Sequence, residues 1–194
     1  MRWCSGFGRP SLRSVSVAWP PACTAIRPCI CEIFGMDGRS AVVSEERLSV
    51  ADLAGRHPRV AIDSDVLIYL LEGAGDRADR AAEIVDACEA GLLTGSMSAI
   101  GLAEILTGPA RTGDAARFEG MAEELHSLRL TIVACDERVA EDAAWIRGAQ
   151  GLAIPDAIHL ASARSSRATA FVTNDRRIRS VSRLEVLYLD DLVA

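Results

Sequence analysis

The chain has 194 residues, the length of a single domain, and it is 49% apolar and 25% charged. These values exclude a disordered or fibrous protein. No run of about eighteen apolar residues is free of charge and proline, which excludes a membrane-spanning helix and predicts a soluble protein without membrane contact. The net charge of −6 excludes binding to nucleic acid through general basicity, so any such contact must be local.

The first 35 residues differ from the rest of the chain. They contain four arginines, one acidic residue and four of the six cysteines, Cys4, Cys23, Cys29 and Cys31. The segment lacks a helical or alternating apolar pattern, so we predict that residues 1–57 form a disordered or non-native extension, for instance upstream of a true start at Met36. A targeting peptide is disfavoured because the apolar stretch is short, and a zinc knuckle is disfavoured by the cysteine spacing.

The rest of the chain has two cysteines, Cys88 and Cys135, both flanked by apolar residues. This pattern indicates free thiols instead of a disulfide framework and fits a reducing cytoplasm. All 21 basic residues are arginine, which excludes any mechanism that needs lysine.

Short apolar segments alternate with amphipathic ones from residue 58 onward. In chain order, the pattern predicts a strand at 60–62, helices at 65–71 and 76–90, a weak strand at 92–97, a helix at 99–107 that ends at Gly108 and Pro109, a helix at 112–127, a strand at 130–133, helices at 136–149 and 155–165, and strands at 170–173 and 185–189. Strands that alternate with helices predict a mainly parallel sheet between two layers of helices. The expected fold is therefore a three-layer α/β/α sandwich over residues 58–194.

Four acidic residues stand apart from other charges. Glu104 and Asp156 are each the only charged residue in a long apolar stretch, and Asp63 and Asp175 follow predicted strands. Ligands of open parallel sheets bind at the carboxyl ends of the strands, where we expect these acids to converge. Two like charges about 4 Å apart repel by ~4 kcal/mol at an effective dielectric constant of 20, so the group needs a cation. Oxygen ligands without cysteine or histidine favour Mg²⁺, with Mn²⁺ as the alternative.

Each of these acids also has a purely structural explanation. Asp63 is suited to cap the following helix, and Asp156 to interact favourably with the N-terminus of its own helix. Asp175 is a common turn residue, and Glu104 needs only an arginine from elsewhere in the chain. Four such coincidences at matching positions are less economical than one shared site.

The acids lie in segments that together resemble a known family. The segments AIDSDVLIYLLEG, AEIL, IPDAIHLASA and FVTNDRR, in this order within residues 59–190, are similar to a PIN-domain ribonuclease of the VapC toxin type. The resemblance implies a metal-dependent endoribonuclease, the toxin of a type II toxin–antitoxin system, whose acids match Asp63, Glu104, Asp156 and Asp175. It also implies a small antitoxin that fills the groove and a homodimer formed through helices.

The residues themselves indicate how such an enzyme would work. A Mg²⁺ ion held by the acids would activate water and offset the charge that develops on the phosphoryl oxygens. We predict Asp63 and Asp156 as metal ligands, and Glu104 and Asp175 as ligands directly or through water. Asp65 either joins these ligands or only caps the following helix.

Three further residues lie close in sequence to the acids. The hydroxyl groups of Ser64 and Thr173 are expected to orient a carboxylate or a phosphate. His159 follows Asp156 by three residues on the same helix face. We expect His159 to pack or cap locally, not to bind metal.

The segment 164–183 carries six arginines against one acid, Asp175. A solvated arginine face is the simplest explanation of such a run. Because the run adjoins Asp175, we predict instead that Arg176, Arg177 and Arg179 contact RNA phosphates, which positions the strand without reading its sequence.

Three other functions compete with a ribonuclease. The sequence from Asp63 to Val66 also matches the DxDx(T/V) loop of haloacid-dehalogenase-type phosphatases, in which Asp63 would be the nucleophile. The later motifs of those phosphatases do not follow, and the lack of lysine disfavours a receiver-type signalling module. A catalytically inactive domain of the same fold, which only binds a partner protein, is the third alternative.

Overall fold

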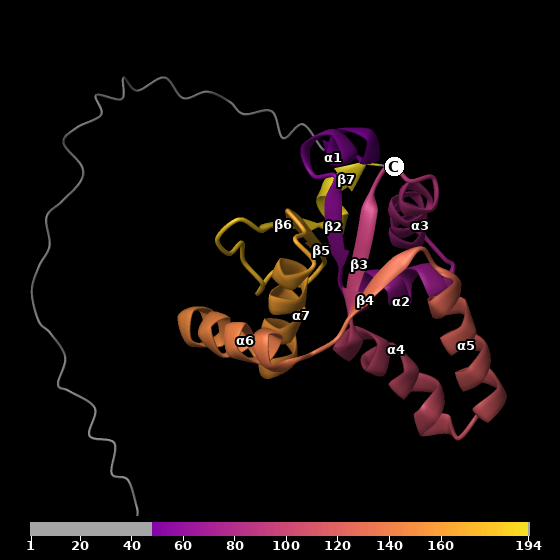
Figure 1. Ribbon diagram of the computed structural model, residues 1–194. Helices are drawn as coiled ribbons and strands as arrows, with labels where there is room; N and C mark the ends of the chain where they lie inside the picture. The colour runs from indigo at the N-terminus through magenta and orange to yellow at the C-terminus, as the bar shows by residue number, and fades with distance from the viewer. Residues whose placement is uncertain (1–47, 194) are drawn as a thin grey trace, which may run out of the picture. The chain divides into compact units, whose positions relative to one another are not determined.

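A parallel sheet forms the centre of the structure, a computed structural model that describes residues 48–193. Its five strands follow the order β4-β3-β2-β5-β6, and every neighbouring pair runs in parallel (Figure 1). The strands are β2 (Arg59–Ile62), β3 (Thr94–Ser98), β4 (Leu130–Val133), β5 (Ala170–Thr173) and β6 (Glu185–Tyr188). The predicted parallel sheet is thus confirmed, while the predictions for the first 47 residues lie outside the described residues.

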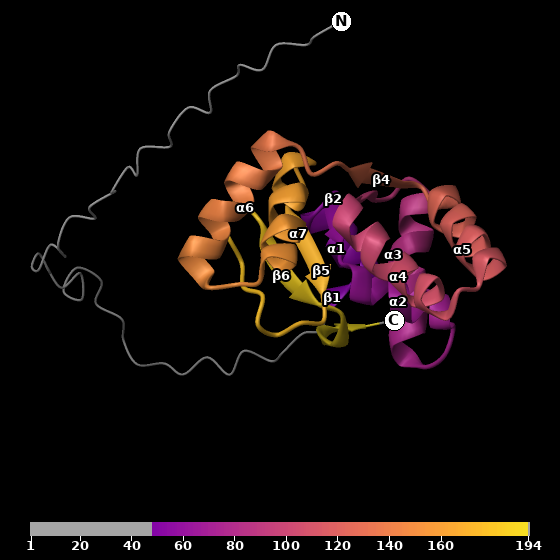
Figure 2. The same cartoon turned by 90° about the horizontal axis from the view of Figure 1, so that it is seen from below.

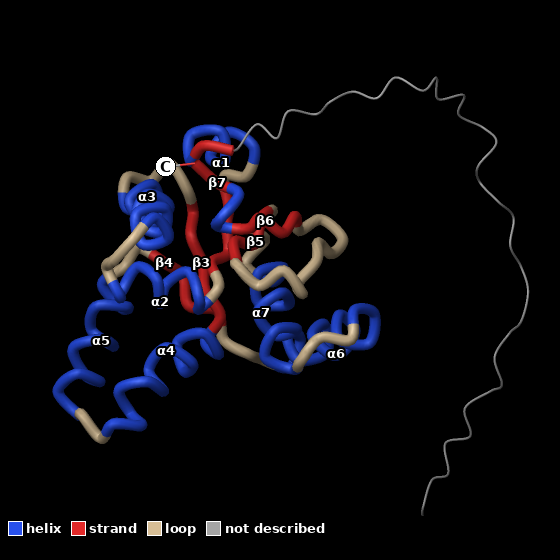
Figure 3. Tube along the Cα trace, turned by 180° about the vertical axis from the view of Figure 1, so that it is seen from behind, coloured by secondary structure: helices blue, strands red, loops and turns tan. Residues whose placement is uncertain are grey.

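Helices cover both faces of this sheet, which confirms the three-layer arrangement (Figure 2). On one side lie α2 (Ser64–Glu72), α3 (Asp76–Glu89), α4 (Ala99–Thr112) and α5 (Ala115–Ser127), and on the other lie α6 (Glu137–Gln150) and α7 (Ile154–Ser165). Figure 3 shows the strands in red between the two sets of helices. Within residues 48–193, no helix is both long and apolar enough to cross a membrane.

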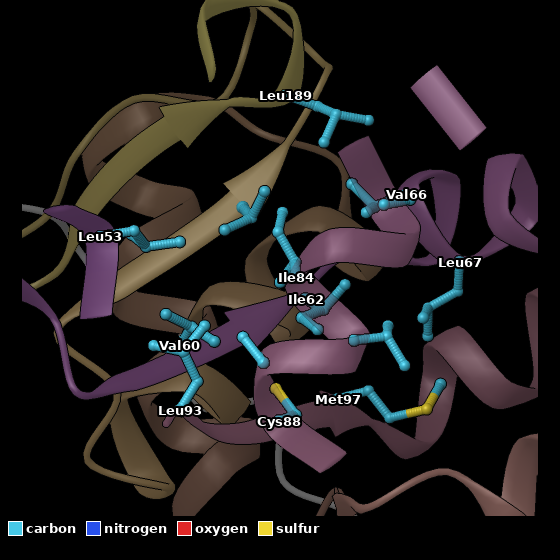
Figure 4. Close-up of a cluster of buried hydrophobic side chains, with 14 of the residues drawn as sticks. Leu53, Val60, Ile62, Val66, Leu67, Ile84, Cys88, Leu93, Met97 and Leu189 are labelled. Atoms are coloured by element: carbon cyan, nitrogen blue, oxygen red, sulfur yellow. The ribbon is translucent and has the colours of Figure 1, made fainter. Parts of the chain in front are cut away.

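Alternate residues of each strand supply the two cores. Val60 and Ile62 of β2 belong to the core beneath α2 and α3, which Figure 4 shows, whereas Ala61 packs with Phe171 against α6 and α7. Both side-chain sets are almost fully buried. A strand that is apolar on both faces is expected in a sheet covered on both sides, because side chains alternate between the faces.

Helix α4 continues past the predicted stop at Gly108 and Pro109 and ends at Thr112. The stop was wrong because a proline removes one backbone hydrogen bond without preventing the turns that follow, and Pro109 is buried inside the helix. The left-handed residue Gly113, at φ +69°, ends α4 instead, and Asp114 caps α5 by accepting a hydrogen bond from the Arg117 amide. The next helix therefore begins at residue 115, not 112.

The folded part extends further toward the N-terminus than the expected boundary at residue 58. Strand β1 (Leu48–Ser49) pairs in parallel with β7 (Leu192–Val193), and α1 (Val50–Arg56) follows it. Ser49 and Asp52 form a reciprocal capping box, a pattern that the sequence displays. Leu53 of α1 is fully buried in the core, so these residues belong to the domain.

Candidate active site

Asp63 lies where β2 ends and α2 begins. Its Oδ1 accepts a hydrogen bond of 2.8 Å from the Ser64 amide, and its Oδ2 accepts one of 2.7 Å from the Thr173 hydroxyl of β5. The side chain is buried, and this burial raises the pKa of Asp63 above its ordinary value. Asp63 thus caps α2 and also contacts Ser64 and Thr173, the two residues whose hydroxyl groups are predicted to orient a carboxylate or a phosphate.

Glu104 projects from α4 toward the same place. Ser98 at the end of β3 caps this helix by accepting from the Ile100 amide. Oε2 of Glu104 accepts a hydrogen bond of 2.7 Å from the Ser64 hydroxyl and lies 3.0 Å from Nε2 of His159. The hydrogen bond with His159 lowers the pKa of Glu104 more than desolvation raises it. The partners of Glu104 are therefore a serine and a histidine, not the arginine that sequence reasoning had considered.

His159 was expected only to pack or cap locally, but it contacts two of the four predicted acids. It is buried on α7, with Nε2 on Glu104 and Nδ1 3.7 Å from Oδ1 of Asp63. Burial favours the neutral ring, but the hydrogen bond to Glu104 and the charges of both carboxylates outweigh it and raise the pKa of His159. The only sequence signal was its spacing of three residues from Asp156.

Gly101 makes room for this histidine. A Cβ atom at this position of α4 would lie 3.2 Å from Cε1 of His159 and 3.5 Å from Cβ of Ser64. Any side chain there would press on the imidazole ring. The glycine therefore permits α4 and α7 to approach closely enough for Glu104 and His159 to pair.

Asp65 lies in the first turn of α2 and faces the loop after β5. Its Oδ2 accepts a hydrogen bond of 3.0 Å from the Asn174 amide, while Oδ1 is buried without a partner among the described residues. Burial, and next the charge of Asp63, raise the pKa of Asp65 to about 6. A desolvated carboxylate oxygen that has no partner among the described residues is suited to contact a cation.

Asp175 is held by an arginine. Its two carboxylate oxygens accept hydrogen bonds from Nε and Nη2 of Arg177, and this contact lowers the pKa of Asp175. Arg177 itself is largely exposed. Asp156, in the first turn of α7, forms no ion pair with another described residue.

The acidic side chains described above and His159 border one pocket of about 480 Å³, which we call the acidic pocket. It is lined by Asp63, Ser64, Asp65, Ile68, Glu104, Asp156, His159, Asp175 and Ile178. All four acids predicted from the sequence line this pocket together with Asp65.

The donor set matches a hard divalent cation in its chemistry. The acids of the pocket supply carboxylate oxygens, and the buried Oδ1 of Asp65 has no hydrogen-bond partner within residues 48–193. Within residues 48–193, however, no three side chains of Asp, Glu, His or Cys stand close enough together to hold an ion as they are. Asp175 would have to release Arg177 before it served as a ligand.

Two of the three arginines expected to contact RNA are bound to acids. Arg176 forms two hydrogen bonds with Asp191 and lies over the ring of Tyr188, 4.1 Å from its centroid. Arg177 pairs with Asp175, as described above, and the Arg179 carbonyl accepts a hydrogen bond from Gln150. Arg177 thus adjoins the acidic pocket through Asp175, which lines it.

The chain is similar to a known protein family and to several solved structures. Residues 60–184 match the PIN domain family. Among solved structures, the chain is similar to VapBC2 from Rickettsia felis bound to a promoter DNA fragment, with 14% identity, a TM-score of 0.53 and coverage of 67% of this chain and 98% of that chain. It is also similar to FitAcB from Neisseria gonorrhoeae, with 22% identity, a TM-score of 0.52 and coverage of 69% and 99%, respectively. At such identities the likeness establishes the fold alone. A comparison with curated proteins gives no match.

Proposed function

The chain belongs to the PIN domain family, and we propose that it is a Mg²⁺-dependent endoribonuclease that acts as the toxin of a toxin–antitoxin pair. The observation that carries this proposal is the pocket in which five carboxylates from α2, α4, α7 and the loop after β5 meet. Family membership confirms the resemblance found in the sequence and removes the phosphatase and receiver alternatives. It leaves the inactive partner-binding domain, which only a measurement of activity separates from the enzyme.

Asp63, Asp65 and Asp156 are the residues that would hold the cation. Divalent metals are the general cofactors of PIN domain nucleases, and Mg²⁺, or Mn²⁺ in its place, suits these oxygen donors. When bound, such an ion supplies Lewis acidity that activates water and offsets charge on the scissile phosphate. The raised pKa values of the buried Asp63 and the partly buried Asp65 support this assignment, because a nearby cation would stabilise their ionised forms.

Glu104 is suited to orient the attacking water at the rim of the pocket. Ser64 and His159 both bond to its Oε2, which leaves Oε1 without a hydrogen bond to a described residue. His159 keeps Glu104 ionised, and an ionised carboxylate accepts a proton from water. We assign Asp175 to the cation directly or through water, once a phosphate has drawn Arg177 away.

The RNA strand would approach along Arg176, Arg177 and Arg179. Arg177 would exchange the carboxylate of Asp175 for a phosphate of the substrate, an exchange between two bidentate partners of similar geometry. Because the net charge of the chain is negative, such local contacts are needed to offset repulsion of the RNA.

A second pocket adjoins the acidic one and supports an antitoxin as partner. It has a volume of about 590 Å³ and shares Ile68 and Glu104 with the acidic pocket. Ile68, Leu71, Ile105 and Met121 give it apolar walls, and Glu72 and Glu104 line it together with Arg117, the single cation among its described lining residues. We propose that it receives an apolar segment of the antitoxin that carries a basic side chain, because this charge distribution is complementary to such a segment.

A homodimer is part of the same proposal. Trp145 of α6 is 79% exposed, which is unusual for so large an apolar side chain on a monomer surface. Light scattering on the purified protein measures the mass directly. A dimer that Trp145→Ser converts to a monomer supports this face as the interface, and a monomeric wild-type protein rejects it.

The decisive experiment is cleavage of single-stranded RNA by the purified protein with Mg²⁺ and with EDTA. We expect cleavage only with the ion, and a loss of at least about 100-fold in Asp63→Asn, Glu104→Gln, Asp156→Asn and Asp175→Asn. Asp79→Asn, an exposed acid of α3, is the matched control and should retain activity. A folded protein that binds Mg²⁺ or a partner but cleaves no RNA would identify the inactive binding domain.

A further inference from the structure

Asp190 lies outside residues 60–184, the part that matches the PIN domain, yet it contacts the loop that borders the acidic pocket. It belongs to the short 3-10 helix η1 (Leu189–Asp191). Leu189 before it and Leu192 after it are both buried in the core. These two anchors fix the position of Asp190 relative to the sheet.

Arginines of α3 hold the carboxylate of Asp190 in place. Nε and Nη2 of Arg77 donate hydrogen bonds of 2.8 and 2.7 Å to its two oxygens, and Nη1 of Arg80 lies 3.7 Å from Oδ1. Arg77 is itself placed over the ring of Tyr69. Both oxygens of Asp190 thus have a defined direction, in contrast to a carboxylate on a freely rotating surface side chain.

Asp190 also bonds to Asn174 in both directions. Nδ2 of Asn174 donates to Oδ2 of Asp190 at 3.1 Å, and the Asp190 amide donates to Oδ1 of Asn174 at 3.3 Å. Asn174 stands directly after β5, so its side chain is tied to η1 at two points. This double contact restrains Asn174, whose backbone amide faces Asp65.

The amide of Asn174 in turn donates to Oδ2 of Asp65. Asp65 lines the acidic pocket, and its other oxygen, Oδ1, is buried without a partner in the described part of the chain. The chain of contacts therefore runs from α3 through Asp190 and Asn174 to Asp65. Each link connects a different element of the fold.

We propose that Asp190 is a positioning residue that, through Asn174, aims Asp65 at the cation of the acidic pocket. The inference rests on the proposed function, since it assigns Asp65 to the ligands and gives the C-terminal segment a role in the site. Asp190 does not line the acidic pocket, so it acts on the cation only through other residues. Its effect is to select which oxygen of Asp65 remains available.

The test measures Mn²⁺ binding by calorimetry and hydrogen exchange of the Asn174 amide by NMR, both on the full chain. We expect Asp190→Asn to weaken Mn²⁺ binding about three- to tenfold, at or below the lower end of the range for partners of metal ligands, because it acts through two intervening residues. Asn174→Ala, which leaves Asp190 bonded to Arg77, should give a similar loss. In an Asp65→Asn background, Asp190→Asn should change Mn²⁺ affinity by less than about twofold, since residues that act as one unit are non-additive.

Asp142→Asn is the matched control, because it removes another ion pair, with Arg164 at 3.0 Å, away from this chain of contacts. It should leave Mn²⁺ affinity and Asn174 exchange unchanged. Wild-type affinity in both Asp190→Asn and Asn174→Ala, or an equal loss with and without Asp65, overturns the proposal. If Asp190→Asn does not fold, Asn174→Ala decides.

The two proposals fail in different ways. A wild-type protein that binds no Mn²⁺ contradicts the proposed function and, with it, the role of Asp65 as a metal ligand. The exchange rate of the Asn174 amide then tests the link from Asp190 through Asn174 to Asp65 by itself: faster exchange in Asp190→Asn than in wild type upholds this link, and an unchanged rate rejects it. Mn²⁺ binding by wild type with no effect of either variant rejects the positioning role alone.

Discussion

Oε2 of Glu104 and Nε2 of His159 lie 3.0 Å apart and join α4 to α7 across the acidic pocket. The pair depends on Gly101, where a Cβ atom would stand 3.2 Å from the imidazole ring. The ring has little freedom to move away, because His159 is buried and its other nitrogen faces Asp63. The close packing of α4 against α7 therefore also determines the orientation of the Glu104 carboxylate.

Gly101→Ala is expected to separate activity from stability. The added methyl group displaces His159 and lowers RNA cleavage by about tenfold, a modest positioning defect. The free energy of unfolding should change by less than about 1 kcal/mol, because the helix propensity gained by replacing glycine offsets the strain. Denaturant titration and RNA cleavage measure the two effects. Gly148→Ala in α6, where a Cβ atom meets open space, should gain stability and keep full activity.

Asp65→Asn should stabilise the metal-free protein in a pH-dependent manner. The pKa of Asp65 is raised from 3.8 to about 6. Between these two pH values, the folded state keeps a proton on Asp65 that the unfolded state has lost. Stability is therefore lost as the pH rises from about 4 to 6, and the deficit is complete above pH 6. The amide variant lacks this deficit.

The expected gain at pH 8 is about 1–2 kcal/mol, less than the full pKa shift implies because Asp65 is partly exposed. It should vanish near pH 4. Urea titrations at both pH values, with EDTA present, measure it, and Asp79→Asn serves as the exposed control. Equal stability of Asp65→Asn and wild type at pH 8 would contradict the raised pKa.

Divalent ions should stabilise the folded protein. At a free Mg²⁺ concentration of about 100 times its dissociation constant, the free energy of unfolding rises by about 2.7 kcal/mol, and EDTA reverses this gain. Asp156→Asn should abolish most of it, since this residue lines the pocket and has no ion-pair partner in the described part of the chain. Thermal denaturation with and without the ion measures the gain. A rise in melting temperature that persists in Asp156→Asn would place the ion elsewhere.

Replacing Arg176 and Arg177 by alanine should weaken RNA binding and flatten its dependence on salt. Each phosphate contact contributes a slope of about −0.7 for a single strand, so loss of both should reduce the slope by about 1.4. Fluorescence anisotropy with a labelled RNA at several salt concentrations measures this slope. Arg138→Ala, an exposed arginine of α6, should leave it unchanged. A double variant with the wild-type slope would remove both residues from the RNA path.

Much of the fold was predictable because it depends on local patterns. The strand at Val60 to Ile62 and the helix that starts beside Pro155 follow from apolar runs and capping signals. The prediction failed at Pro109, where burial within α4 outweighed the local cost of proline. It also missed α1, whose capping box at Ser49 was visible but whose burial against the core was not.

Some residues of the candidate site could likewise be predicted from the sequence, and others could not. Asp63, Glu104, Asp156 and Asp175 are visible in the sequence because a charge in apolar surroundings is costly and therefore conspicuous. His159 and Asn174 carry no such signal, since histidine and asparagine occur in many structural roles. Their contacts with Glu104 and Asp65 join positions 55 and 109 residues apart.

Residue types and their spacing within single segments are enough to predict the layered parallel fold and to single out the four acids. The neighbour of each acid depends instead on the folded chain: His159 meets Glu104, Arg177 meets Asp175, and Asn174 meets Asp65. Directional hydrogen bonds between distant segments depend on how helices pack against the sheet. That packing is a property of the whole core, so no single stretch of sequence contains it.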